Sequence, residues 1–481
     1  MATTPDVDHE TSNSITRRQF LGATLAAGGG LAFAGQRMPR LASAQAHQAP
    51  LQGTLSVYDH QSLSYPGAKK FIAEYEKLRP GVKIEIVSGP PGGIDTYITT
   101  LMAGGSPPDL FVVADNTVPW QNVKDNWWVD LTPYAHKPDP FVPGNRAWVD
   151  LVKPGVIPTL LFRKGQMYSL TTTGFDVAFF YNKDIYQKLH VDPPTEWWQM
   201  VEAFKKFKAA GYIPFFCCLG EVEIADETQG LWLILQDTVM NKTIDRLRPS
   251  DPSGTITVDE LVRGIKDGIY SPRSADYQEV WRLFKSLRPY MQNAPAGAIS
   301  SAQGLAAFET GRVATWFEGS FNAPSIKRVN WGAFVTPTLT SRTTSFATKG
   351  PQRKGAYGAL AGYPWCVPVH TVHKGKLDLA MDFIYWLSAP KQTEVYATEN
   401  GVIPLDRTST NPPEIAPFVE AASNVSRVSA AELALPQPFF TNKSKLVEAY
   451  VLGQVSLDSA MSQMQQMLDT AANQAIKEFG L

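Results

Sequence analysis

The chain has 481 residues, a formal net charge of −1, 12 tryptophans and three cysteines. A charge this close to zero gives no basic surface of the kind that binds nucleic acid. No continuous apolar run is long enough to span a membrane as a helix, and three cysteines are too few for a disulfide scaffold. The length exceeds what one hydrophobic core usually organises and therefore predicts two domains.

The first 46 residues have the organisation of an export signal. Arg17 and Arg18 stand before an uncharged stretch of Ala, Gly and Leu, and small residues fill 42–46. This order is typical of a twin-arginine (Tat) signal peptide with an A-x-A cleavage site. The apolar stretch is too short and too rich in glycine for a membrane anchor, and no cysteine lies near the cleavage site. The sequence thus predicts a periplasmic protein that the Tat pathway exports and that carries no lipid anchor.

Helix and strand patterns alternate after the signal. Phe71, Tyr75 and Leu78 lie on one face of a helical pattern, which the Pro-Gly pair after it ends. Small residues and prolines at 104–108 end a second helical pattern and lead into a short apolar run. The expected elements are a helix over 71–78, a strand over 82–87, a helix through Tyr97 and Leu101, and a buried strand over 109–113.

Polar residues directly follow these strands. Asp115 and Asn116 come after the 109–113 strand, with Trp120 close behind. His60 and Gln61 follow the first strand of the chain in the same way. In open α/β sheets the ligand crevice lies outside the carboxyl ends of the strands. We therefore expect these side chains to line a ligand site.

The alternation continues to the C-terminus without a repeat of fixed length. The expected strands are 167–175, 177–182, 212–219, 313–317, 331–337 and 360–369, and the expected helices are 197–210, 305–310 and 378–387. Residues 457–481 carry apolar side chains at three- and four-residue steps, which predicts a long amphipathic helix. We expect this helix to pack on the second domain.

The order of these elements resembles the extracellular solute-binding proteins, the receptor subunits of ABC importers, and in particular their carbohydrate-binding group (family 1). Each motif is weak by itself, and the shared order carries the resemblance. The motifs are Leu101–Asn116, Tyr181-Asn182-Lys183-Asp184, Leu305–Ala314, Glu318-Gly319-Ser320-Phe321, Trp331–Pro337, Ser388–Gln392 and Gly401–Pro404.

The resemblance implies an α/β fold of two lobes, each a doubly wound sheet flanked by helices, joined by a hinge of several strands. Residues 1–46 would be the signal peptide, 47–172 and 332–392 the first lobe, and 173–331 and 393–481 the second lobe. It also implies a monomer that binds a sugar or oligosaccharide between the lobes and delivers it to membrane permease subunits. Such a protein performs no catalysis and needs no cofactor or metal.

A sugar site pairs hydrogen-bonding side chains with flat aromatic rings, because sugars present hydroxyl rims and C–H faces. Residues at the other strand ends and near the expected crossings between lobes therefore join those already named. In this site Trp120 would stack on the sugar, while Asp115 and Glu318 would accept hydroxyl hydrogen bonds from opposite lobes. The complete expected ligand site is His60, Gln61, Asp115, Asn116, Trp120, Thr172, Glu221, Glu223, Glu318, Gly319, Ser320, Phe321, Gly362 and Trp365.

Two alternatives stay open. Glu221, Glu223 and Glu318 could supply the carboxylate pair of an exported carbohydrate hydrolase, whose stereochemical course depends on their separation. The same fold could instead bind another solute, such as an organic anion, a polyamine or ferric iron. A ferric site of this family usually pairs tyrosines at the cleft, and Tyr181 and Tyr363 are not adjacent in sequence.

The cysteines and a histidine pair favour structural roles. Cys217 and Cys218 fall in an apolar strand pattern, which predicts buried thiols, although either could pair with Cys366 in an oxidising compartment. His370 and His373 lie in a polar loop before a helix, where solvation is a better interpretation than metal binding.

Overall fold

The structure is a computed structural model. It describes residues 50–59, 68–89, 94–113, 125–162, 165–219, 222–252, 254–293, 301–359, 362, 364–411 and 413–481. The predicted signal peptide therefore lies outside the described residues. Across the described helices, none combines the length and the apolar character needed to cross a bilayer.

The first sheet has four strands in the order β2-β1-β3-β9. They are β1 (Gly53–Asp59), β2 (Val82–Ser88), β3 (Leu110–Val112) and β9 (Trp365–Cys366). The central strand β1 pairs in parallel with β2 and β3, and β9 joins the β3 edge antiparallel. Residues 364–366 thus return, late in the chain, to a sheet that begins at residue 53.

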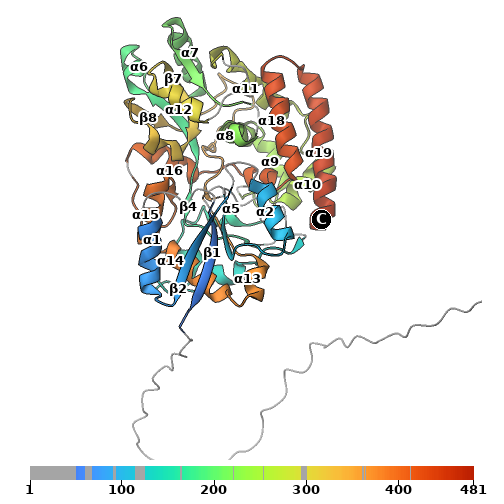
Figure 1. Cartoon of the computed structure of the whole chain (residues 1–481). Coiled ribbons are helices and arrows are strands. Elements are labelled where there is room, and N and C mark those ends of the chain that lie inside the picture. The colour runs from blue at the N-terminus through green and yellow to red at the C-terminus, as the bar shows by residue number, and fades with distance from the viewer. Residues whose placement is uncertain are drawn as a thin grey trace, which may run out of the picture. The chain divides into compact units, whose positions relative to one another are not determined.

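Successive side chains of a strand point to opposite faces of the sheet. Helices cover both faces of this sheet. On one side, Leu55 and Val57 share a core with α1 (Ala68–Leu78) and α14 (Leu377–Ser388). The ring centroids of Phe71 and Trp386 lie 4.7 Å apart in this layer. On the other side, Tyr58 packs 5.7 Å from Tyr97 of α2 (Ile94–Ala103). The predicted doubly wound arrangement is confirmed for this sheet (Figure 1).

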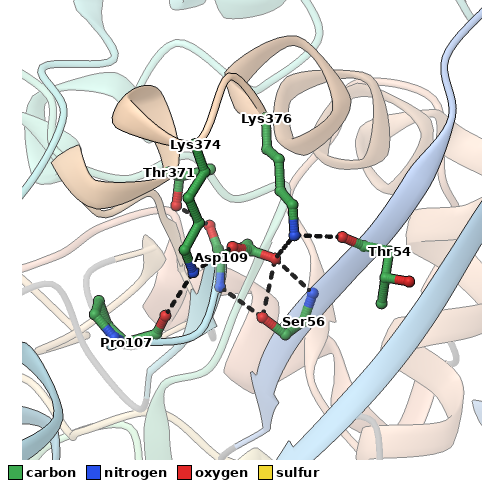
Figure 2. Close-up of polar contacts among 7 residues, drawn as sticks. All are labelled: Thr54, Ser56, Pro107, Asp109, Thr371, Lys374 and Lys376. Atoms are coloured by element: carbon green, nitrogen blue, oxygen red, sulfur yellow. Dashed lines mark hydrogen bonds and ion pairs between the residues drawn. The ribbon is translucent and has the colours of Figure 1, made fainter. Parts of the chain in front are cut away.

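Asp109 fixes the start of β3. It is 1% exposed, and its Oδ2 accepts hydrogen bonds from the Ser56 backbone N–H at 3.0 Å and from Lys376 at 2.7 Å. Oδ1 of Asp109 accepts a hydrogen bond from Lys374 at 3.0 Å, and the Thr371 hydroxyl donates to the backbone carbonyl of Asp109 at 2.7 Å (Figure 2). Burial acts to raise the pKa of Asp109, but these hydrogen bonds outweigh it and hold the pKa below its usual value. The carboxylate of Asp109 therefore ties the start of β3 to β1 and to the turn after α13 (Val369–His373), and its backbone carbonyl ties it to α13 itself.

The second sheet has the strand order β6-β7-β5-β8. Its strands are β5 (Val177–Asn182), β6 (Ile213–Phe216), β7 (Val313–Gly319) and β8 (Trp331–Phe334). β6 and β7 are parallel, whereas β5 runs antiparallel to both of its neighbours. On one face Phe204 of α7 (Trp197–Ala209) stacks on Phe215. On the other, Phe180 packs against Phe418 of α16 (Ala416–Ala422), so this sheet is also covered on both sides.

A group of longer helices lies beside the second sheet (Figure 1). They are α8 (Val222–Val239), α10 (Val258–Lys266), α11 (Ala275–Ser286), α18 (Gln437–Val451) and α19 (Leu457–Phe479). The last helix packs along α18, α10 and α11, which confirms the predicted C-terminal helix and its docking. Its final residue, Phe479, meets Phe162 edge to face at 5.3 Å.

Two short strands join segments that are far apart in sequence. β4 (Thr173–Gly174) pairs antiparallel with β10 (Ile403–Pro404). Immediately after β4, the buried Asp176 accepts backbone N–H groups from Ala356, Tyr357 and Gly358. The remaining elements are α4 (Thr132–Ala135), η2 (Trp148–Asp150), α5 (Ile157–Leu160), α6 (Lys183–Lys188), α9 (Asn241–Leu247), η3 (Arg288–Tyr290), α12 (Ser301–Glu309), η4 (Ser320–Ser325), α15 (Pro390–Asn400), η6 (Pro413–Ile415) and α17 (Ser429–Leu433).

Several strand predictions are too long. Of the segment 167–175 only Thr173–Gly174 is a strand, and among the described residues of 360–369 only Trp365–Cys366 is one. The strands expected at 212–219 and 331–337 are shortened to Ile213–Phe216 and Trp331–Phe334. Two threonine hydroxyls, those of Thr171 and Thr173, donate to the Gly362 carbonyl. Local side-chain hydrogen bonds of this kind compete with a regular sheet ladder. The prediction that Cys217 and Cys218 are buried is confirmed.

Asp139 gives a prediction about pH. Its side chain is 2% exposed, and its Oδ2 has no hydrogen-bond partner among the described residues. Burial, with repulsion from Asp382 adding to it, raises the pKa of Asp139 from 3.8 to about 7. The folded protein therefore holds a proton that the unfolded chain has lost, and stability falls as pH rises through this window.

We expect the variant Asp139→Asn to remove this pH dependence. The quantity to compare is the free energy of unfolding of the variant minus that of the native protein. This difference should be about 2 kcal/mol larger at pH 8 than at pH 5, because only the native protein loses stability between the two pH values. Urea unfolding at the two pH values measures the difference. An equal effect of the substitution at both pH values would contradict a buried, protonated Asp139.

Candidate functional site

The structure describes only part of the predicted ligand site. His60, Gln61, Asp115, Asn116, Trp120 and Glu221 lie outside the described residues. Glu223 belongs to α8, within the part of that helix whose side chains are not described. These seven positions remain predictions, and the other seven can be placed.

Four of the placed residues follow one another at the end of β7. Glu318 is fully buried, and its Oε1 accepts the Gly319 backbone N–H at 2.9 Å. Ser320 donates its backbone N–H to the Asp176 carbonyl at 3.0 Å. Phe321 meets Phe175 edge to face, with ring centroids 5.2 Å apart. The end of β7 is therefore joined directly to the segment after β4.

The other three placed residues join 170–173 to 362–365. Thr172 shares a 2.6 Å hydroxyl hydrogen bond with Thr393. Gly362 has no room for a side chain, since an added Cβ would lie 1.9 Å from the Thr173 carbonyl oxygen. Trp365 is 5% exposed, exchanges two backbone hydrogen bonds with Leu170 and meets Phe383 edge to face. In this structure these residues hold neighbouring segments together.

The two groups meet around an aromatic cluster. Phe175 lies between the rings of Phe321 and Tyr357, at 5.2 and 5.5 Å. Asp176, next in the chain, accepts hydrogen bonds from the backbone around Tyr357. Its carboxyl group is fully buried, which raises its pKa to about 6 although the four backbone N–H groups favour the charged form. The segment 172–176 thus contains Thr172 and contacts Ser320, Phe321 and Gly362.

A cavity lies beyond the end of β6. Its volume is about 30 Å³, and its lining comes from the segment after β6 and from helices α8, α11 and α18. Trp232 on α8 and Lys443 on α18 both line it although they are more than 200 residues apart, a distance that no local sequence pattern bridges. The lining residues are Leu219, Thr228, Gln229, Trp232, Phe284, Lys443, Ser444 and Val447.

Lys443 is the charged residue of this lining. It is 1% exposed, its ammonium group contacts the carboxylate of buried Glu432, and it lies 5.8 Å from the centre of the Trp232 ring. Tyr270 donates a second hydrogen bond to Glu432, at 3.2 Å. Burial lowers the pKa of Lys443 to about 7. The pair leaves little net charge beside the cavity.

Metal binding finds no support in the described part of the chain. No three His, Cys, Asp or Glu side chains gather there into a possible metal site. The rings of His370 and His373 lie 6.5 Å apart on the short helix α13.

Comparison with solved structures relates this fold to known proteins. A chitin oligosaccharide binding protein has a TM-score of 0.65 at 16% identity, and covers 88% of this chain and 99% of its own. The sugar-binding protein MalE from the phytopathogen Xanthomonas citri has a TM-score of 0.65 at 17% identity, and the match covers 89% of this chain and 99% of MalE. The solute-binding protein RafE in complex with raffinose has a TM-score of 0.64 at 17% identity, and the match covers 88% of this chain and 100% of RafE. At such identities the likeness establishes the two-lobe fold.

Sequence comparison establishes the family. None of the curated proteins matches the chain in sequence. The family model described as bacterial extracellular solute-binding protein matches residues 60–394, which include seven of the eight strands of the two four-stranded sheets. This match covers more than half of the chain, and the chain belongs to the family of bacterial extracellular solute-binding proteins.

Proposed function

We propose that the protein is the receptor of an ABC importer that binds a sugar or oligosaccharide and delivers it to membrane permease subunits. The observation that carries the proposal is the likeness of the whole described fold to proteins named for chitin oligosaccharides and raffinose. The family match supports a location outside the cytoplasmic membrane. Tat export, the absence of a lipid anchor and a monomeric state belong to the same proposal.

The ligand would lie between two lobes, 47–172 with 332–392 and 173–331 with 393–481. The proposed contacts comprise the strand-end residues predicted from the sequence, with Asp115 and Trp120 on the first lobe. Glu318 is fully buried and already accepts the Gly319 N–H, so a hydrogen bond to the ligand would require this segment to open. The hinge would run through crossings near residues 172, 331 and 393, and the segment 172–176 at the first of them contacts Ser320, Phe321 and Gly362.

In this proposal the protein binds its ligand and releases it without catalysing a reaction. A ligand that touches both lobes adds contacts only in the closed form, and it therefore shifts the population toward closure. The permease would then recognise the closed, loaded form. No catalytic step enters this cycle, and the protein needs no cofactor.

A panel of carbohydrates tests the proposal. One class of sugar should raise the melting temperature of the purified protein, because a ligand that binds only the folded state stabilises it by mass action. Differential scanning fluorimetry with mono- and oligosaccharides, organic anions and polyamines measures the shifts. A response to an organic anion or polyamine alone would overturn the carbohydrate assignment.

A further inference from the structure

The cavity beyond β6 is too small for a sugar ring. Since a water molecule needs about 10–15 Å³ of such space, a volume of about 30 Å³ takes roughly two or three non-hydrogen atoms. A carbohydrate could therefore place only one small substituent there. The cavity follows the carboxyl end of β6, the edge of the sheet at which ligands of α/β proteins bind.

The lining offers donors to such a substituent. Gln229 and Trp232 lie on neighbouring turns of α8, and both are buried. Gln229 Nε2 and Trp232 Nε1 have no hydrogen-bond partner among the described residues. Thr228 uses its hydroxyl proton on the Cys218 carbonyl. A buried N–H without a partner is costly, and an acceptor oxygen in the cavity would relieve that cost.

The other walls are mostly apolar, apart from the Ser444 hydroxyl and the Lys443 ammonium. Leu219, Phe284 and Val447 contribute hydrocarbon surface to the lining. A hydroxymethyl group would leave much of this hydrocarbon surface without a contact, because it carries no methyl group. A carboxylate would bring a charge, and the Lys443 ammonium is already neutralised by Glu432. The chemistry that fits is an acceptor oxygen together with a methyl group.

We propose that this cavity is a subsite for the acetyl group of an acetylated carbohydrate. The carbonyl oxygen accepts from Gln229 and Trp232, and the methyl group packs against the apolar walls. The inference rests on the proposed carbohydrate-binding function and specifies its substrate class. An N-acetylated amino sugar and an O-acetylated sugar present the same group, so the test compares both.

Matched ligand pairs test the inference by calorimetric titration. N-acetylglucosamine oligomers are compared with glucose oligomers of the same linkage and length, and O-acetylated xylo-oligosaccharides with their deacetylated forms. At least one acetylated member should bind about tenfold more tightly than its partner. Equal affinities within both pairs would overturn the subsite while leaving carbohydrate binding intact. Binding of no carbohydrate at all would overturn the proposed function and the subsite together.

A variant pair places the effect at the cavity. Gln229→Met keeps the size of the side chain but removes its N–H donors, and should reduce the preference for the acetylated ligand to about threefold or less. Gln236→Met is the control on the same helix, since Gln236 is buried and donates to Tyr270 outside the cavity. The control should melt at a lower temperature yet keep the full preference. A preference that survives in Gln229→Met, or that falls equally in both variants, would contradict the assignment.

Discussion

Deletion of residues 457–481 should lower the melting temperature so far that the protein is largely unfolded near 37 °C. Helix α19 buries eight side chains, among them Met461, Met464, Leu468 and Phe479, against α18, α10 and α11. Burial of one large apolar side chain contributes about 1.5–3 kcal/mol, so the loss would equal a large share of the roughly 5–15 kcal/mol that stabilises a typical domain. Thermal unfolding followed by circular dichroism measures it.

Two point variants separate packing from chain length. Leu468→Ala should cost about 2–5 kcal/mol, because Leu468 is fully buried. Ser462→Ala, at an exposed position of the same helix, should change the free energy of unfolding by less than about 0.5 kcal/mol. A truncated protein that melts with the full-length one would show that α19 does not stabilise the fold.

Replacement of Asp176 by Ala should destabilise the protein by on the order of 5 kcal/mol. The two carboxylate oxygens accept four backbone N–H groups, from Val177, Ala356, Tyr357 and Gly358, at 2.8–3.1 Å. Asp176 is fully buried, so water cannot readily replace the lost acceptor. Each buried donor without a partner costs about 1–3 kcal/mol. Equilibrium urea unfolding gives the difference.

Asp176→Asn serves as the matched control. Its amide oxygen can still accept from Val177 and Ala356, but its NH₂ group faces the N–H groups of Tyr357 and Gly358. We expect the Asn variant to lose less free energy of unfolding than the Ala variant, but more than about 1 kcal/mol. If the Ala variant unfolds within 1 kcal/mol of the native protein, then Asp176 does not hold the segments 173–176 and 355–358 together.

Local sequence patterns predicted the regular elements well. The predicted helix at 71–78 is α1, the strand at 177–182 is β5, and the C-terminal helix is α19. A regular period of apolar residues marks both helices, and a continuous apolar run marks the strand. The strands expected at 167–175 and 360–369 fail because threonine hydroxyls and Gly362 bind one another there. Such contacts join segments about 190 residues apart, and a local sequence pattern cannot predict them.

The site was harder to predict than the fold, because its contacts come from tertiary structure. The Asp109 motif indicated a buried strand, yet its ion pairs with Lys374 and Lys376 could not be foreseen from the sequence. Glu318 looked like an accessible acid at a strand end, whereas its carboxylate turns back to the next backbone N–H. The cavity brings Gln229 on α8 together with Lys443 on α18. Neither residue belongs to a motif that would have singled it out.

The central claim is that this chain binds a carbohydrate and releases it unchanged. The most direct measurement is a calorimetric titration with the sugar that gives the largest thermal shift, followed by mass spectrometry of the ligand recovered after denaturation. The account predicts one ligand bound per chain and the recovery of that ligand with its mass unaltered after long incubation. Recovery of a hydrolysed or otherwise altered product would contradict it and indicate a carbohydrate-active enzyme.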